Sequence, residues 1–271
     1  MRFASTKSLD ARVAAARSPL APREPALWRI ASVHPHALHM VDASGDRVLS
    51  IGDARAVPLP TQWRLASASA WWHGATPGTS VLHEGDEVTW RSDDGSLRTV
   101  HAVRTWRPSR VTHSPDTTLL SRVPNTLVTT EGSSLDGDIR LTDFADALAA
   151  RTGVTASARA LVGLGEGLTP AGDDAICGMV LGARACGVTM SDHHRHDLVS
   201  LTRGRTTALS ASCIAAALDG YAVADVVNLV HDFTRGRWDS PSLERVLAMG
   251  HSSGRDLIAG LIAWLRRFSH T

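Results

Sequence analysis

Lysine is almost absent from this sequence, which contains a single one, Lys7, close to the N-terminus. Phosphate-binding loops of the G-K-[ST] type, Schiff-base enzymes and protein kinases each need a lysine within the folded body of the protein. The lack of any other lysine therefore argues against these three mechanisms. Arginine supplies the positive charge instead, and the formal net charge is only +1. A charge this small predicts neither a nucleic-acid-binding surface nor adsorption to an anionic membrane.

Cysteine is scarce, and long hydrophobic runs are missing. The three cysteines, Cys177, Cys186 and Cys213, are odd in number and show no C-x-x-C spacing, so we expect reduced thiols in the core of a cytoplasmic protein. Charged residues interrupt residues 1–25 every few positions, so we expect neither a signal peptide nor a membrane span there. The hydrophobic fraction of 43% and the charged fraction of 20% are those of an ordinary globular protein.

The first half of the chain has a strand-like pattern. We expect a loosely held tail over residues 1–25 and a β-rich domain over residues 26–110. Residues 37–52 and 87–103 each place a turn-forming stretch between short apolar runs, which predicts two β-hairpins. Six of the eight tryptophans lie in this domain, which favours the interior of a barrel or sandwich over a surface that stacks bases or sugars.

The second half of the chain changes to the helical period. Residues 111–140 are rich in Ser, Thr, Pro, Asp and Gly and are expected to form a connecting segment. Residues 141–271 repeat apolar side chains at three-to-four spacing, which predicts a helical domain. The predicted fold class is therefore α+β, with an N-terminal β-rich region, barrel-like or sandwich-like, followed by a mostly α-helical C-terminal region.

A glycine-rich loop stands out within the helical half, in the segment LVGLGEGLTPAGDDAICG. Gly163, Gly165 and Gly167 alternate just before an expected helix start, at which Thr169 is the capping candidate. Backbone N–H groups beside a helix N-terminus can hold an anion, so we expect the loop to bind one. The helix that follows carries Gly178 and is expected to be central and buried, because glycines let another helix approach closely.

Two acids, Asp173 and Asp174, follow the loop directly. In the first turn of a helix they complement the helix dipole, which is a purely structural role. They are also candidates for catalysis, and as oxygen ligands they are an alternative site for Mg²⁺. No other cofactor or metal is expected.

A second polar helix start is predicted in RTTALSASCIAAALDG, residues 205–220. Arg205, Thr206, Thr207 and Ser210 can share one helical face there and would suit a carboxylate or a phosphate. A plain helix start, with Thr206 as the cap and a solvated arginine, is the alternative.

A third polar helix start lies in GHSSGRDLIAG, residues 250–260. His251 is a candidate for acid–base catalysis or substrate binding, and Ser252 is a candidate for substrate binding. Ser253 and Asp256 have the spacing of a capping box, which we favour over a nucleophilic serine, although both are also candidate substrate ligands.

The three segments together resemble a known bacterial family. GLGEGLTPAGDD resembles the signature GLGxGLTPxGDD of domain-of-unknown-function family 2877, described as putative carboxylases. The other two segments are similar to that family's T..S...L..A..G and GxSSGxDxxxG stretches and occur in the same order, so the resemblance covers residues 161–265. Glu166 stands where the family commonly has proline, and Ala171 where it has serine.

The characterised branch of this family is a subunit of oxamate carbamoyltransferase, the AllH type. That enzyme works with other subunits in allantoin breakdown and phosphorolyses a carbamoylated oxamate to carbamoyl phosphate. The resemblance implies carbamoyl-group transfer or cleavage on a small ureide, carbamate or carboxylate in nitrogen metabolism, with an anionic or carbamoylated substrate. A non-catalytic partner subunit, or a metabolite-binding module of a multi-subunit enzyme, is the alternative.

All three segments are expected to begin a helix with small polar residues. Helix starts expose amides, hydroxyls and positive dipole ends, so three of them together would make a polar, electropositive pocket. We expect one cleft to be lined by Thr169, Asp173, Arg205, Thr206, Ser210, His251, Ser253 and Asp256.

Overall fold

The computed structural model describes residues 11–67, 71–113, 133–135 and 137–269. The chain divides into two compact units, Met1–Arg107 and Pro108–Thr271.

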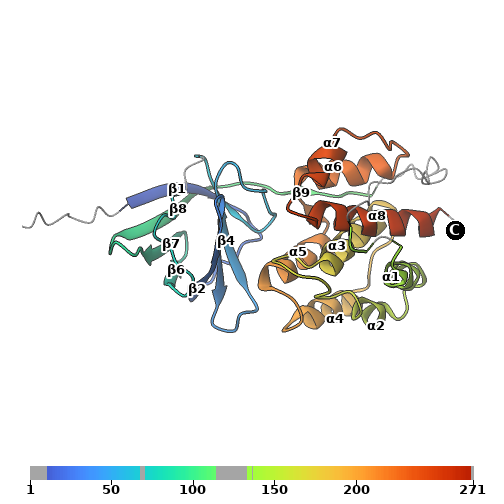
Figure 1. Ribbon diagram of the computed structural model, residues 1–271, viewed down its shortest axis with the longest axis horizontal. Helices are drawn as coiled ribbons and strands as arrows, with labels where there is room; N and C mark the ends of the chain where they lie inside the picture. The colour runs from blue at the N-terminus through green and yellow to red at the C-terminus, as the bar shows by residue number, and fades with distance from the viewer. Residues whose placement is uncertain (1–10, 68–70, 114–132, 136, 270–271) are drawn as a thin grey trace, which may run out of the picture. The chain divides into compact units, whose positions relative to one another are not determined.

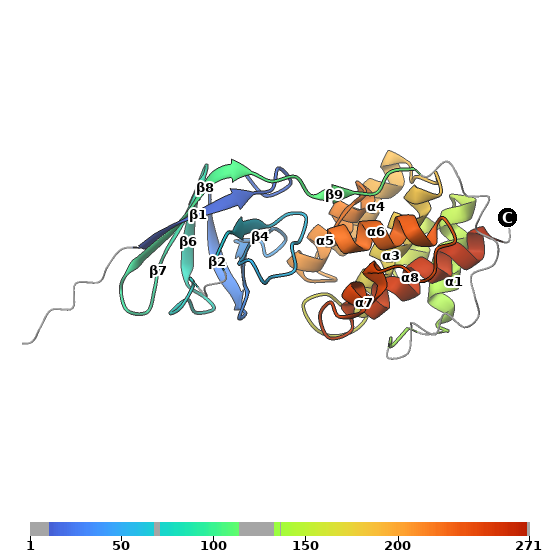
Figure 2. The same cartoon turned by 90° about the horizontal axis from the view of Figure 1, so that it is seen from above.

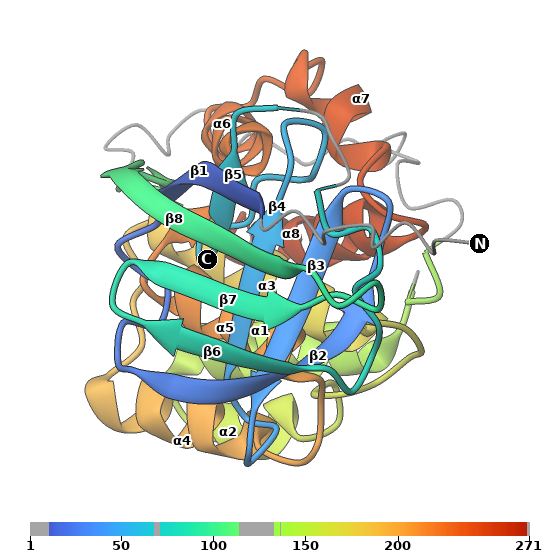
Figure 3. The same cartoon turned by 90° about the vertical axis from the view of Figure 1, so that its left-hand side faces the viewer.

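The N-terminal unit contains a closed barrel of eight strands (Figures 1 and 3). The order around the barrel is β1-β5-β4-β3-β2-β6-β7-β8, and Figure 3 shows β6, β7 and β8 side by side. The pairs β1–β8 and β4–β5 are parallel, and the other neighbours are antiparallel. The strands are β1 (Ala11–Arg17), β2 (Ala26–Val33), β3 (Ala37–Asp42), β4 (Val48–Gly52), β5 (Trp63–Leu65), β6 (Ser80–Glu84), β7 (Glu87–Arg91) and β8 (Leu97–Thr105).

Both predicted hairpins are present. Strands β3 and β4 pair antiparallel with Met40 opposite Leu49, and β7 and β8 pair antiparallel with Val88 opposite Val100. These four side chains are fully buried inside the barrel because period-two alternation sends them all to the same face. Strands β2 and β6 lie between the two hairpins in the barrel and connect them.

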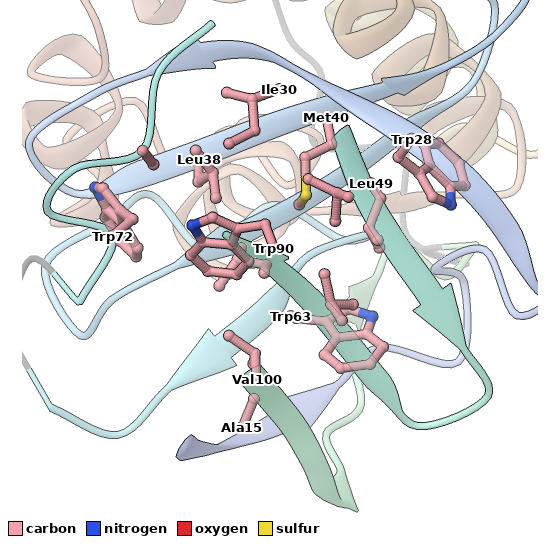
Figure 4. Close-up of a cluster of buried hydrophobic side chains, with 14 of the residues drawn as sticks. Ala15, Trp28, Ile30, Leu38, Met40, Leu49, Trp63, Trp72, Trp90 and Val100 are labelled. Carbon is pink, nitrogen blue, oxygen red and sulfur yellow. The ribbon is translucent and has the colours of Figure 1, made fainter. Parts of the chain in front are cut away.

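Tryptophan fills much of the barrel interior. Trp28, Trp63 and Trp90 are almost completely buried and belong to one hydrophobic cluster with Leu38 and Met40 (Figure 4). The interpretation of the tryptophans as barrel core is therefore confirmed, and so is the predicted fold class.

One segment departs from the sequence prediction. Ala11–Arg17, expected to be part of a tail over residues 1–25, is strand β1, which pairs with β5 on one side and with β8 on the other. The sequence ARVAAAR has little β-propensity of its own. Pairing with both neighbours, together with burial of Ala15 and Ala16, makes it a strand.

The C-terminal unit is helical apart from a short pair of strands. Among its described residues, no helix is long and apolar enough to cross a membrane. The pair is β9 (Ser109–Arg110) with β10 (Tyr221–Ala222). The helices are α1 (Ile139–Ala150), α2 (Val154–Ala158), α3 (Ala171–Ala185), α4 (Asp192–Thr202), α5 (Ala208–Leu218), α6 (Ala224–Phe233), α7 (Ser242–Leu247) and α8 (Ser253–Phe268).

Helix α3 is the centre of this unit, as the glycine pattern predicts. It packs mainly against α8 and α5, and Figures 1 and 2 both show it among the other helices. A Cβ atom at Gly178 of α3 would lie 2.0 Å from the carbonyl oxygen of Leu257, and one at Gly260 of α8 would lie 2.0 Å from that of Ala175. The two helices therefore touch backbone to backbone, which brings their N-terminal turns together.

Candidate functional site

Asp173, in the first turn of α3, ties two of the motif segments together. Its side chain is fully buried, and its Oδ1 accepts a hydrogen bond from the Gly163 amide at 2.9 Å. Its Oδ2 accepts from the hydroxyls of Ser210, at 2.7 Å, and Thr206. Three donors thus stabilise a carboxylate that would be very costly to bury alone. Asp173 fixes the glycine loop against the start of α5.

The third motif joins the same place through the glycine loop. The hydroxyl oxygens of Thr169 and Ser253 lie 2.7 Å apart and share a hydrogen bond. A second contact connects the loop to α5, because the Thr207 hydroxyl donates to the carbonyl oxygen of Leu168. The three helix starts therefore converge in a single hydrogen-bonded cluster.

Asp174 and Asp256 complete this cluster and differ from Asp173 in their hydrogen bonding. Asp256 is fully buried and Asp174 is 8% exposed. Among the residues that the structure describes, the Oδ2 atom of each is buried without a hydrogen-bond partner. The other oxygen of Asp256 accepts from the Ser133 hydroxyl at 2.7 Å. Two carboxyl oxygens at the meeting point of three motifs are therefore without a partner among the described residues.

Burial also changes the acidity of Asp174. Loss of solvation raises the pKa of this carboxyl to about 8, and the neighbouring charges of Asp256 and Asp173 add to the rise. Hydrogen bonds from the Ser253 and Thr169 hydroxyls act in the opposite direction without cancelling it. At neutral pH Asp174 is therefore mostly protonated and can donate a hydrogen bond. We call Asp173, Asp174 and Asp256, with the hydroxyls of Thr169, Thr206, Ser210 and Ser253, the aspartate junction.

The charge of the junction differs from the expected electropositive pocket. Three acids meet there, and the cation predicted to join them does not. The guanidinium of Arg205 is exposed and donates to the carbonyl oxygen of Arg159 at 3.1 Å. Arg205 contributes its backbone instead, because a Cβ atom at Gly163 would lie 1.9 Å from its carbonyl oxygen.

Several predicted site residues lie at the edge of the junction or outside it. Gly165 and Gly167 are in the exposed part of the loop, whereas the Gly163 amide is occupied by Asp173. His251 is exposed, and its backbone carbonyl oxygen accepts a hydrogen bond from the Arg255 guanidinium. Ser252 is the half-buried N-cap of α8 and makes no side-chain capping bond.

At the three helix starts, the two predicted caps, at α3 and α8, are wrong, and so is the alternative considered at α5. Pro170 rather than Thr169 is the N-cap of α3, and Thr207 rather than Thr206 caps α5 by accepting from the Ser210 amide at 3.0 Å. Ser253 is the first residue of α8 and forms no capping box with Asp256. In each case the side chain predicted to cap its own helix bonds instead to another segment of the junction.

One residue of the site was missed by sequence reasoning. Ser133 lies in the segment expected to be a connection, and nothing in its sequence context points to Asp256. Thr207 was one of the hydroxyl residues expected at the second helix start, and its role as the N-cap of α5 is a finding of the structure.

The thiols near the aspartates are not suited to nucleophilic chemistry. Burial raises the pKa of Cys213 to about 12, and Asp174 adds to the rise. Burial likewise raises the pKa of Cys177 well above its ordinary value. All three cysteines of the chain are free. In the part of the chain that the structure describes, no three His, Cys, Asp or Glu side chains are grouped to hold a metal ion.

Comparison with known proteins bears on the same helical segments. Residues 161–265 match the family described as oxamate carbamoyltransferase subunit AllH. The AllH match spans the three motif segments and every member of the aspartate junction, and the resemblance predicted from the motifs is confirmed over these residues. The β-barrel lies outside the AllH match. No solved structure matches the chain.

Proposed function

We propose that the helical unit belongs to a carbamoyltransferase-like enzyme and that the aspartate junction binds the carbamoyl or amide group of its substrate. The observation that carries the proposal is the pair of buried, unpartnered oxygens, Asp174 Oδ2 and Asp256 Oδ2. A buried polar atom without a partner costs about 1–3 kcal/mol. A ligand that supplies the missing partners recovers this free energy.

The chemistry of the two acids matches a –CO–NH₂ group. A primary amide presents one carbonyl acceptor and two N–H donors. The protonated carboxyl of Asp174 donates to the carbonyl, and the free oxygen of Asp256 accepts from the N–H. The substrate class is then a small ureide, carbamate or oxamate-like carboxylate, and the AllH description names an oxamate carbamoyltransferase.

Within this proposal the three acids have different roles. In phosphorolysis the bond between the carbamoyl carbon and the leaving nitrogen breaks, a bond from that carbon to a phosphate oxygen forms, and the nitrogen takes up a proton. Asp174 holds a proton at neutral pH and is the candidate donor: the proton passes from its hydrogen bond with the carbonyl to the leaving nitrogen, and the attacking hydrogen phosphate returns a proton to Asp174. Asp173 is a positioning residue because both of its oxygens are bonded within the chain. His251 was a catalytic candidate from the sequence. Because its side chain is exposed, this proposal assigns it no catalytic step.

The exposed part of the glycine loop is the proposed contact for phosphate. Residues 165–168 are exposed and lie just before α3, where the helix dipole favours an anion. Addition of inorganic phosphate should shift the backbone amide resonances of these residues. A titration repeated with Mg²⁺ tests whether a cation takes part. Phosphate shifts confined to other regions would contradict this part of the proposal.

The amide-recognition proposal is tested by comparing oxamate with oxalate. Oxalate has the same size but carries a second carboxylate in place of the amide, so calorimetric titration of the full chain should show oxamate bound more tightly. Asp174→Asn and Asp256→Asn should each weaken oxamate binding by about tenfold. Asp143→Asn, an exposed acid on α1, is the matched control and should change nothing. Equal affinity for oxamate and oxalate would sink the proposal.

Catalysis is tested separately from binding. The chain is mixed with candidate partner subunits, and carbamoyl phosphate formation from a carbamoylated oxamate is followed. Turnover that is lost in Asp174→Asn supports a catalytic subunit. Oxamate binding with turnover that is unaffected by Asp174→Asn would instead indicate a metabolite-binding partner subunit.

A further inference from the structure

A cavity of about 350 Å³ lies in the helical unit, away from the aspartate junction. It is lined by the C-terminal part of α3, including Val180 and Arg184, and by the first turn of α4. Arg184 is on the same helix as Asp174 but about 15 Å further along its axis. The volume is within the range that encloses small organic ligands.

Arg184 is held in a fixed position at the wall of this cavity. Its Nε donates to the carbonyl oxygen of Val111 at 3.1 Å. Gly220 leaves the room for the side chain, since a Cβ atom there would lie 2.5 Å from the same Nε. Among the described residues no acceptor is bonded to the terminal nitrogens of Arg184. A guanidinium that is anchored through Nε presents those nitrogens to a ligand with little loss of entropy.

Positive charge exceeds negative charge around Arg184. Burial lowers the pKa of its guanidinium, and the nearby charges of Arg110 and Arg195 lower it further. The carboxylate that opposes them is Asp219, which already forms an ion pair with Arg195. The cavity lining also includes Arg151, exposed at the C-terminal end of α1. An anion in the cavity would reduce the repulsion among these cations.

The remaining wall is largely apolar. Val180 and Val188 line it together with other aliphatic side chains, while His194 and Ser191 contribute polar atoms from the start of α4. A cavity with a few fixed cations on an apolar surface selects a molecule that has both an acidic group and an apolar portion. Inorganic phosphate fits the cations but leaves the apolar wall uncovered.

We propose that this cavity is a second ligand site, for a small organic anion whose acidic group pairs with Arg184 and Arg151 and whose apolar portion packs against Val180 and Val188. Nothing in the AllH family description assigns a ligand to it. The site is independent of the carbamoyl chemistry proposed for the aspartate junction.

The test uses the full chain and benzoate as the probe, with benzamide and inorganic phosphate as comparisons. Benzoate should bind in calorimetric titration, and its ring protons should show nuclear Overhauser contacts to the methyl groups of Val180 and Val188. Benzamide has the same shape without the charge and should bind at least about tenfold more weakly, because a charge-assisted bond to arginine is lost. Inorganic phosphate should also bind more weakly than benzoate.

Two variants and one control locate the charge requirement. Arg184→Gln and Arg151→Gln should each weaken benzoate binding by about tenfold. Arg151 is exposed, so its variant keeps the test valid even if Arg184→Gln folds poorly. Arg245→Gln, an exposed arginine of α7, should bind benzoate like the unmodified chain. The proposal is overturned if benzoate fails to bind, if benzamide gives equally strong contacts to the methyl groups of Val180 and Val188, or if the Arg151 variant keeps full affinity.

Discussion

The hydroxyls of Thr169 and Ser253 are hydrogen-bonded at 2.7 Å, although 84 residues separate them in the chain. This contact joins the glycine loop before α3 to the first turn of α8. Both hydroxyls also lie against Asp174, where they oppose the rise of its pKa. The pair therefore links the geometry of the loop to the acidity of the carboxyl group.

Replacing Thr169 by valine keeps the shape of the side chain and removes the hydroxyl. We expect the free energy of unfolding in urea to fall by about 1 kcal/mol, the typical contribution of one hydrogen bond. Oxamate affinity should also fall, because the loop is no longer tied to α8 beside Asp174. Thr142→Val, at an exposed position of α1, is the control. A variant with reduced stability but unchanged oxamate binding would show that the contact serves the fold alone.

Asp173 should matter mainly to the fold. In the unmodified chain the hydroxyls of Ser210 and Thr206 donate to Oδ2 of Asp173. In Asp173→Asn an amide N–H₂ group, which cannot accept a hydrogen bond, takes the place of that oxygen. We expect a loss of about 1–3 kcal/mol in the free energy of unfolding, the cost of leaving buried polar groups mispaired. Asp143→Asn should lose less than about 0.5 kcal/mol. Full stability of Asp173→Asn would contradict the bonding described for this residue.

The raised pKa of Asp174, about 8, predicts a pH dependence of stability. The unfolded carboxyl has a pKa near 4, so between pH ~4 and ~8 the folded protein holds a proton that the unfolded chain has released. The stabilising contribution is fully present below pH ~4, falls as the pH rises through this window, and is lost above pH ~8. The slope is at most about 1.4 kcal/mol per pH unit.

The measurement is the free energy of unfolding from pH 5 to pH 9 for the unmodified chain and for Asp174→Asn. The asparagine variant lacks the titrating group, so the difference between the two curves should change steadily up to about pH 8 and then become constant. A difference that is independent of pH would mean that Asp174 titrates normally. Oxamate binding by the unmodified chain should weaken over the same upper range, as Asp174 loses the proton that it donates.

Gly163→Ala should disrupt the junction more than Gly167→Ala. Both glycines have positive φ, 75° and 95°, so an alanine at either position costs about 1 kcal/mol in backbone strain. At Gly163 the added Cβ would also meet the carbonyl oxygen of Arg205, whereas nothing lies within 4 Å at Gly167. We expect a further loss of about 1–3 kcal/mol at Gly163 from overpacking. Equal melting temperatures of the two variants would contradict this close approach.

Local patterns were sufficient for much of the architecture. Turn residues between short apolar runs determined the hairpins of β3–β4 and β7–β8, because alternation and turn chemistry act within a few residues. The concentration of tryptophans in the first half of the chain indicated a barrel core. Gly178 indicated that the helix carrying it, α3, is buried and closely packed. Three motifs in one order were also sufficient for the AllH resemblance.

The tertiary structure alone decided how the polar side chains are used. Thr169 and Ser253 have the local sequence of helix caps, but a hydroxyl bonds to whichever partner lies nearest in space, and close packing of α3 against α8 brings them to each other. The same packing buries Asp174 and Asp256 together and leaves one oxygen of each without a partner. The sequence placed the three acids and most of the hydroxyls of the junction among its candidate site residues. Burial and cross-helix contacts, which depend on segments far apart in the chain, determined the acidity and the free hydrogen-bonding positions of the site.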